Sequence, residues 1–77
     1  MQELLRTIVA GLVEDPSAIA ITEDAPNEEG VIVYHLHVAA DDMGRVIGKQ
    51  GRIAKAIRVV MRSAAQQNGS KIMVEID

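Results

Sequence analysis

The sequence predicts an α+β fold in which strands form one sheet and helices cover a single face of it. Apolar residues recur at helical spacing near the start of the chain and again in its second half, and three β-branched runs bounded by turn residues read as strands. The segment between the last two strands is too short for two ordinary crossovers, so its helices must pack as a pair on one sheet face. A length of 77 residues predicts one domain, residues 1–77.

The first half of the chain is expected to form one helix and two strands. Apolar residues at helical spacing predict a helix over residues 2–14, which Asp15-Pro16 ends. A short strand is expected over 18–22, followed by a polar connection over 23–30. Residues 31–38, which are β-branched and apolar except for two histidines, form the clearest strand.

The second half is expected to form a short helix, a tight turn and a longer helix. Asp41 or Asp42 is placed to cap the short helix, which runs through Ile47. Residues 48–51 then turn the chain into a helix over about 52–66. Asn68-Gly69 ends this helix, and alternating apolar residues predict a closing strand over 71–76.

The longer helix has two predicted faces at 100° per residue. Its core-facing stripe is Ile53, Ile57, Val60 and Ala64, and its cationic stripe is Lys55, Arg58 and Arg62. Val59 falls on the polar side of this wheel and Met61 at its flank. The apolar surface is therefore wider than one small sheet needs.

Charge is unevenly distributed along a chain of net charge −3. Residues 43–74 contain no Asp or Glu and hold every Lys and Arg except Arg6. Such an asymmetry marks a surface suited to an anionic partner, although a solvated basic face is the simpler alternative.

The sequence contains no evidence for a catalytic, metal or membrane-inserted protein. It has no cysteine, and no Ser or Thr lies in a recognisable nucleophile motif. His35 and His37 face the same way in a strand, but no third ligand is placed beside them, so we expect no metal and no cofactor. Because Met1-Gln2-Glu3 does not resemble a signal peptide and no run nears the ~20 apolar residues of a membrane span, we expect a cytoplasmic protein.

The Gly48–Gly51 turn is the strongest functional signal. Two glycines flanking Lys49 and Gln50 let backbone approach a sugar-phosphate chain closely. The helix that begins at Arg52 directs its free N–H groups and positive dipole end to the same place. A tight turn between two helices is the alternative, and a Walker A loop fits poorly because Gln50 stands where Ser or Thr would bind magnesium.

The segment Val46-Ile47-Gly48-Lys49-Gln50-Gly51-Arg52-Ile53-Ala54-Lys55-Ala56-Ile57 resembles the signature of the KH domain, whose GxxG loop clamps about four nucleotides of single-stranded nucleic acid. The element order resembles the type II, or prokaryotic, KH fold: α-β-β-α-α-β with a three-stranded mixed sheet. The likeness covers essentially the whole chain. With Asp41-Asp42-Met43-Gly44-Arg45 leading into the loop, the chain is similar to the small bacterial single-KH-domain RNA-binding proteins of the KhpA/YlqC family.

This resemblance implies a non-catalytic binder of single-stranded RNA, acting as an RNA chaperone or post-transcriptional regulator. It further implies a homodimer, pairing with a larger KH-containing protein of the KhpB/EloR/Jag type, and a link to cell elongation and division. The alternative interpretation is a protein-interaction module that dimerises and binds RNA incidentally.

Two sets of residues are expected to serve these functions. The residues expected to bind RNA are Arg45, Ile47, Gly48, Lys49, Gln50, Gly51, Arg52, Ile53, Ala54 and Lys55, with Ile47, Ile53 and Ala54 forming an apolar floor for bases. The residues expected at a dimer interface are Val59, Met61, Arg62 and Ala65. Because the chain lacks Phe and Trp, we expect little base stacking and weak sequence discrimination.

Overall fold

The computed structural model describes residues 1–76, and its elements follow the predicted order. The helices are α1 (Gln2–Ala10), α2 (Met43–Ile47) and α3 (Arg52–Gln67), and the strands are β1 (Ala20–Glu23), β2 (Val31–His37) and β3 (Lys71–Ile76). Short 3₁₀ turns are η1 (Pro16–Ala18), η2 (Ala40–Asp42) and η3 (Lys49–Gly51).

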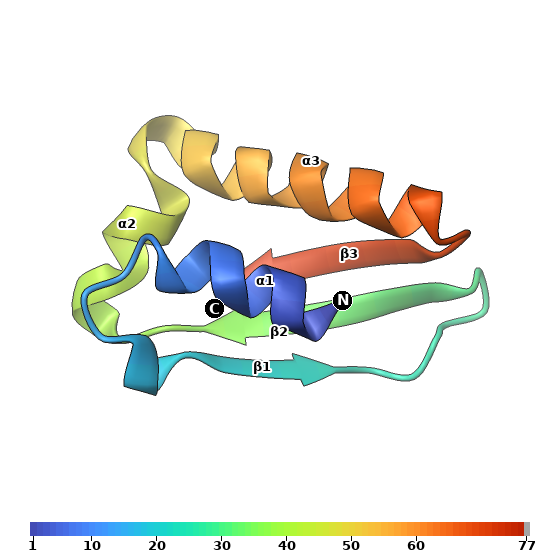
Figure 1. Ribbon diagram of the computed structural model, residues 1–77, viewed down its shortest axis with the longest axis horizontal. Coiled ribbons are helices and arrows are strands. Elements are labelled where there is room, and N and C mark those ends of the chain that lie inside the picture. The colour runs from blue at the N-terminus through green and yellow to red at the C-terminus, as the bar shows by residue number, and fades with distance from the viewer. Residues whose placement is uncertain (77) are drawn as a thin grey trace.

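The three strands form one mixed sheet in the order β1-β2-β3. β1 is antiparallel to β2, and β3 runs parallel to β2, with Tyr34 opposite Val74 in the register of the parallel pair. α1 and α3 lie on the same side of this sheet, with α3 alongside β3 (Figure 1). The predicted type II KH fold is therefore confirmed in element order, in its three-stranded mixed sheet and in the packing of the helices on one face.

The core lies between this sheet face and the two longer helices. Alternate residues of β2 and β3 point inward, as the period of two requires. Residues of α1 and α3 at helical spacing meet them, and the buried cluster consists of Leu5, Val9, Ile19, Tyr34, Leu36, Val38, Val46, Ile57, Met61 and Val74. Tyr34 is its only aromatic member, so aliphatic packing and Met61 fill most of the interior.

Two predicted boundaries in the first half were wrong. α1 ends at Ala10 and not at Glu14, because Gly11 leads into a tighter turn in which the N–H of Leu12 bonds the carbonyl of Val9 at 2.9 Å. Leu12 still packs against the core from this turn. The first strand begins at Ala20 because Pro16 starts a 3₁₀ turn through Ala18 instead of extended chain.

The predicted cap of the short helix was also wrong. Asp42 immediately precedes α2, but neither Asp41 nor Asp42 makes a side-chain cap bond. The Asp42 carboxylate turns instead toward the chain that follows α1, where it accepts hydrogen bonds from the backbone N–H groups of Glu14 and Asp15. Asp42 thus bonds backbone groups that are distant in sequence and does not cap the helix that follows it.

The buried face of α3 differs from the predicted stripe. Ile57 is buried as expected, but Val60 is 48% exposed, whereas Met61 is fully buried. Ala54 and Ala65 join Met61 on the buried side. α3 must pack against both the sheet and α1, so its buried surface is broader and rotated relative to a single stripe.

The end of α3 agrees with the prediction within one residue. The helix continues to Gln67, and Gly69 has φ +72°, the left-handed conformation that glycine favours after a helix. The N–H of Ser70 bonds back to the carbonyl of Ala65 at 2.8 Å, which closes the helix end and directs the chain into β3.

Candidate nucleic-acid interface

The turn between α2 and α3 has a backbone that glycine alone adopts easily. Gly48 has φ +70° and ψ −179°, a region used almost only by glycine, and Gly51 has φ +74° and ψ +15°. A Cβ at Gly48 would also collide with Cγ1 of Ile53 and lie 3.1 Å from its backbone nitrogen. No heavy atom lies within 4 Å of a Cβ built at Gly51. At position 48 both the backbone conformation and the nearby Ile53 exclude a Cβ. At position 51 only the backbone conformation favours glycine.

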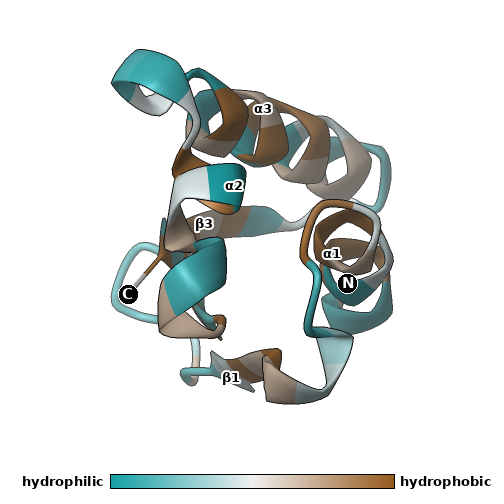
Figure 2. Ribbon diagram, turned by 90° about the vertical axis from the view of Figure 1, so that its left-hand side faces the viewer, coloured by the Kyte–Doolittle hydropathy of each residue, from teal (hydrophilic) through white to brown (hydrophobic). Residues whose placement is uncertain are grey.

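Gln50 is the only non-glycine residue with positive φ among the described residues. Its φ of +57° and ψ of +25° place it in the left-handed region, which costs roughly 1 kcal/mol for a residue with a Cβ. The surrounding turn holds this conformation and presents Lys49 and Gln50 as exposed side chains. In Figure 2 this hydrophilic turn projects from the body of the molecule.

Three cations surround the turn and the start of α3. Lys49, Arg52 and Lys55 are all exposed, and within residues 1–76 none of them is part of a salt bridge. No side chain caps the first turn of α3. The N–H of Arg52 bonds the carbonyl of Lys49, and the N–H groups that follow it have no side-chain acceptor. Positive charge and uncapped backbone donors therefore converge on one side of the Gly48–Gly51 turn.

The other predicted cations are partly engaged by the protein itself. Arg45 forms ion pairs with Glu14 at 2.6 Å and with Asp42 at 3.3 Å, so it is not a free charge beside the turn. Arg58 donates from Nε to the carbonyl of Val74 at 3.1 Å, which turns it toward β3. Arg58 and Arg62 line a small pocket against β3 with Ile72, Met73 and Val74. The predicted cationic stripe is therefore divided between two sides of α3.

Only two of the three apolar residues expected to contact bases are accessible at the surface. Ile47 is exposed and Ile53 is half-buried, so both offer surface near the turn. Ala54 is 4% exposed and lies in the interior, which corrects its assignment as a base contact.

An apolar patch lies along α1 and α3, next to the cations. Ile8 and Leu12 from α1 and the turn after it line it together with Ile53, Ala56, Ile57 and Val60 from α3. A second shallow hollow continues past Val59 and Val60 to Arg52 and Lys55. Among the predicted interface residues, Val59 is 52% exposed and Arg62 is exposed, but Met61 and Ala65 are fully buried within the protomer and cannot contact a partner.

Sequence reasoning missed several residues of this patch. Val60 was assigned to the core, although its exposure and its neighbours place it on the surface. Ile8 and Leu12 belong to the apolar spacing that predicted the first helix, and the structure shows that they also line the patch. The breadth of the apolar surface on the helical wheel was the signal that part of it lies outside the core.

The two histidines of β2 have different surroundings. His35 lies 2.9 Å from the carboxylate of Asp24 and 3.4 Å from that of Glu75, so it links β2 to β3 and to the β1–β2 connection. His37 is exposed at the end of the strand. Within residues 1–76 no cluster of three His, Asp or Glu side chains is arranged to hold a metal ion. No helix in this part of the chain has the length and apolar character needed to cross a membrane.

Comparison with known proteins places this geometry in context. The family model described as KhpA/KhpB, KH domain, matches residues 2–76. The RNA-binding protein KhpA of Clostridium acetobutylicum is 47% identical over 76 residues, covering 99% of each chain. The protein of the same name from Listeria monocytogenes is 46% identical over 76 residues, covering 99% of this chain and 97% of that protein.

Solved structures with a similar fold come from a larger protein. Era in complex with MgGDPNP and nucleotides 1506–1542 of 16S ribosomal RNA superimposes with a TM-score of 0.69 at 23% identity, covering 96% of this chain and 28% of the Era chain. A point variant of Aquifex aeolicus Era bound to GDP·AlF₄⁻ gives a TM-score of 0.66 over the same shares of both chains. At this level of identity the likeness concerns the fold.

Proposed function

Because the chain belongs to the KhpA/KhpB family of KH domains, we propose that it binds single-stranded RNA, without catalysis, through the Gly48–Gly51 turn and the start of α3. The observation that carries this proposal is the turn itself. Its two glycines expose backbone, its intervening side chains are exposed, and unpaired cations border it. The names of the curated relatives support RNA as the ligand.

In the proposed mechanism, both backbone groups and side chains contact the RNA. Phosphates lie against the glycines and the uncapped first turn of α3, where N–H groups and the helix dipole favour negative charge. Lys49, Arg52 and Lys55 add three charges along the same path. Ile47 and the exposed part of Ile53 provide apolar contact for bases. With no Phe or Trp in the chain, this contact supplies little stacking energy, so sequence discrimination is weak.

The proposal is tested by placing carboxylates in the turn. Lys49→Asp combined with Gln50→Asp is expected to abolish binding of a short labelled single-stranded RNA in a fluorescence polarisation assay. The melting temperature is expected to change little, because both side chains are exposed and Asp tolerates the left-handed conformation at position 50.

A matched control has the same change in charge elsewhere. Lys71→Asp combined with Asn68→Asp alters the exposed end of α3 and the start of β3, at the far end of the molecule from the turn (Figure 1). This control is expected to bind RNA far better than the first variant. Equal RNA affinity of the wild type and the Lys49/Gln50 variant would contradict the proposal. An equal loss of RNA affinity in this variant and in the control would show that net charge, and not the turn, determines binding.

A second candidate function is protein interaction, and the apolar patch on α1 and α3 favours it. Two copies that cover Val59, Val60 and Ala56 would remove apolar area worth ~25 cal/mol per Å² from water. We propose that the protein forms a homodimer through this patch, and that a larger KH-containing protein of the KhpB/EloR/Jag type competes for it. The interface expected from the sequence at Met61 and Ala65 is thereby moved to neighbouring residues of α3.

The cellular role stays a prediction. We propose a cytoplasmic RNA chaperone or post-transcriptional regulator linked to cell elongation and division, as the family resemblance implies. Crosslinking in cells, followed by sequencing of the bound RNA, distinguishes this role from a protein-only module, which would give no enrichment over background.

A further inference from the structure

Arg45 lies in the helix that leads into the proposed RNA-binding turn, but its surroundings differ from those of the other cations. We propose that Arg45 is a positioning residue and does not contact RNA. With Asp42 it forms a clasp that fastens α2 to the chain following α1 and so fixes the Gly48–Gly51 turn. This inference rests on the proposed function.

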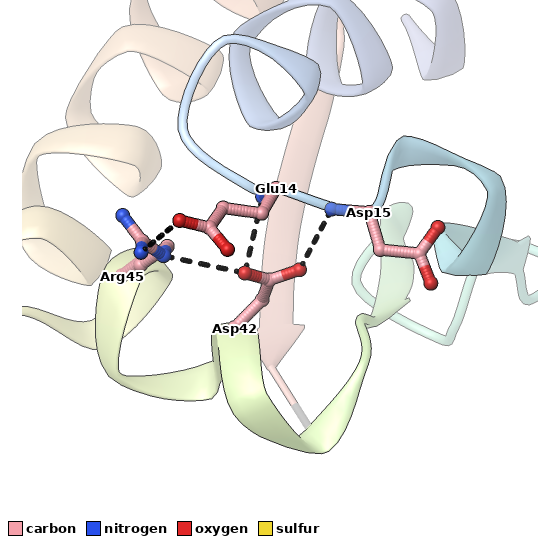
Figure 3. Close-up of polar contacts among 4 residues, drawn as sticks. All are labelled: Glu14, Asp15, Asp42 and Arg45. Atoms are coloured by element: carbon pink, nitrogen blue, oxygen red, sulfur yellow. Dashed lines mark hydrogen bonds and ion pairs between the residues drawn. The ribbon is translucent and has the colours of Figure 1, made fainter.

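Asp42 is the anchor of this clasp. Its side chain is 3% exposed, and Asp42 is the one buried charged residue within the described chain. Oδ1 accepts a hydrogen bond from the N–H of Glu14 and Oδ2 one from the N–H of Asp15, each at 3.1 Å (Figure 3). A buried carboxylate is costly unless it is paired and hydrogen-bonded, and these bonds meet that requirement together with Arg45.

Arg45 is held by carboxylates on both sides. Its Nε lies 3.3 Å from Oδ1 of Asp42, and its Nη2 lies 2.6 Å from Oε1 of Glu14 (Figure 3). The three side chains together carry one net negative charge, so a phosphate approaching Arg45 meets no excess of positive charge. Lys49, Arg52 and Lys55 have no such carboxylate partners in the described structure.

The clasp controls the turn because α2 is too short to hold its own orientation. α2 has five residues, and a single helical turn contributes little stability by itself. Its direction is set by Val46, which is fully buried in the core, and by the polar contacts of Asp42 and Arg45. Gly48 follows directly, with its N–H bonded to the carbonyl of Gly44 at 2.9 Å. Loosening the clasp would therefore loosen the start of the turn.

The test compares Arg45→Gln, Arg45→Lys and Lys49→Gln with the wild-type protein. Affinity for a labelled single-stranded RNA oligonucleotide is measured at several salt concentrations, together with the melting temperature and amide hydrogen exchange by NMR. Lys49→Gln removes a phosphate contact and should reduce the slope of log affinity against log salt by about 0.7. Arg45→Gln should weaken binding roughly two- to tenfold with an unchanged slope.

Arg45→Lys distinguishes position from charge. A lysine keeps the positive charge but lacks the planar fork that bonds two carboxylates at once, so it should bind RNA as weakly as Arg45→Gln. In both variants, amide exchange should accelerate at Glu14 and Asp15, and at residues 48–51 of the turn. Glu14→Gln, which alters the exposed side of the clasp, should have a smaller effect on affinity and leave the slope unchanged.

Several outcomes would overturn the inference. If Arg45→Gln reduces the slope of log affinity against log salt and Arg45→Lys restores both slope and affinity, Arg45 is a phosphate contact. Tighter RNA binding with a steeper slope in Glu14→Gln would lead to the same conclusion. A lower melting temperature with unchanged affinity and unchanged exchange in the turn would leave the clasp with a structural role only. If the wild type binds no RNA, the proposed function fails, while amide exchange in residues 48–51 still decides whether the clasp holds the turn.

Discussion

Gly48 and Gly51 both have positive φ, but they differ in how strictly glycine is required. At Gly48 the backbone conformation and the Ile53 side chain both oppose a Cβ. At Gly51 only the left-handed backbone does. The two ends of one short motif therefore respond differently to the same substitution.

Gly48→Ala should destabilise the protein by more than about 2 kcal/mol, and Gly51→Ala by about 1 kcal/mol. The difference arises because relief of the Ile53 contact requires movement of α3 as well as of the turn. Urea unfolding followed by circular dichroism measures both values. Equal free energies of unfolding for the two variants would contradict the steric role of Ile53.

Tyr34 provides a pH-dependent signal from the core. Burial, with a smaller contribution from the negative charge of Glu23, raises the pKa of its hydroxyl above the usual 10.0. Because the folded-state pKa is raised, the neutral hydroxyl contributes stability below pH 10.0, and this contribution is lost as the pH rises through the higher folded-state value.

As the only aromatic residue, Tyr34 can be titrated alone by the ultraviolet absorbance of tyrosinate. We expect ionisation at higher pH in the folded protein than in the urea-unfolded chain. In Glu23→Gln the folded-state pKa should fall but stay above that of the unfolded chain, because burial is the larger cause. Coincident titration curves for folded and unfolded protein would contradict this assignment.

At the scale of elements, sequence predicted the existence and order of the helices and strands better than the faces they bury. The Gly48–Gly51 turn and Gly69 were predictable because their conformations depend on local backbone sterics. The buried face of α3 was not, since apolar residues surround more than half of the helix and packing against α1 and β3 selects among them. The partners of Arg45 were not predictable either, because Glu14 lies 31 residues away in the chain.

The corrected face of α3 predicts opposite results for adjacent residues. Val60→Asp should keep the fold and abolish self-association, because Val60 is half exposed in the apolar patch. Met61→Asp should unfold the protein, because a buried charge with a lost apolar side chain costs on the order of 4 kcal/mol. Sedimentation equilibrium and thermal unfolding measure the two properties.

Asn68→Asp serves as the control for Val60→Asp, since it introduces the same charge at an exposed site outside the patch. It should self-associate like the wild type. A wild-type mass of 8.3 kDa that does not rise with concentration would rule out the dimer.

For the whole molecule, the free cations of the turn lie far from the most acidic loop. The basic turn and the start of α3 lie at one end, and the β1–β2 connection, which contains Asp24, Glu28 and Glu29, lies at the other (Figure 1). The net charge of −3 therefore does not describe the surface beside the turn, where Lys49, Arg52 and Lys55 have no carboxylate partner in the described structure. RNA affinity should depend on the cations near the turn and only weakly on the acidic end.

Affinity for single-stranded RNA should fall with salt at a slope of about −2 to −3 in log–log form, as expected for roughly three or four phosphate contacts at about 0.7 each. Lys49→Glu should flatten this slope more than Arg58→Glu, because Arg58 is turned toward β3. Polarisation titrations over a salt series provide the measurement. A slope near zero would exclude phosphate contacts as the main source of affinity.

The separation of charge has a consequence that depends on the size of the molecule. Its longest dimension is 34 Å, whereas the Debye length at physiological ionic strength is about 8 Å. An RNA strand at the turn is therefore screened from the carboxylates of the β1–β2 connection, which oppose binding little. At about 0.01 M salt the Debye length rises to about 30 Å, comparable with the molecule itself. At this low salt concentration the distant carboxylates begin to repel the RNA. Each further decrease in salt should therefore raise the RNA affinity by a smaller amount as the concentration approaches about 0.01 M.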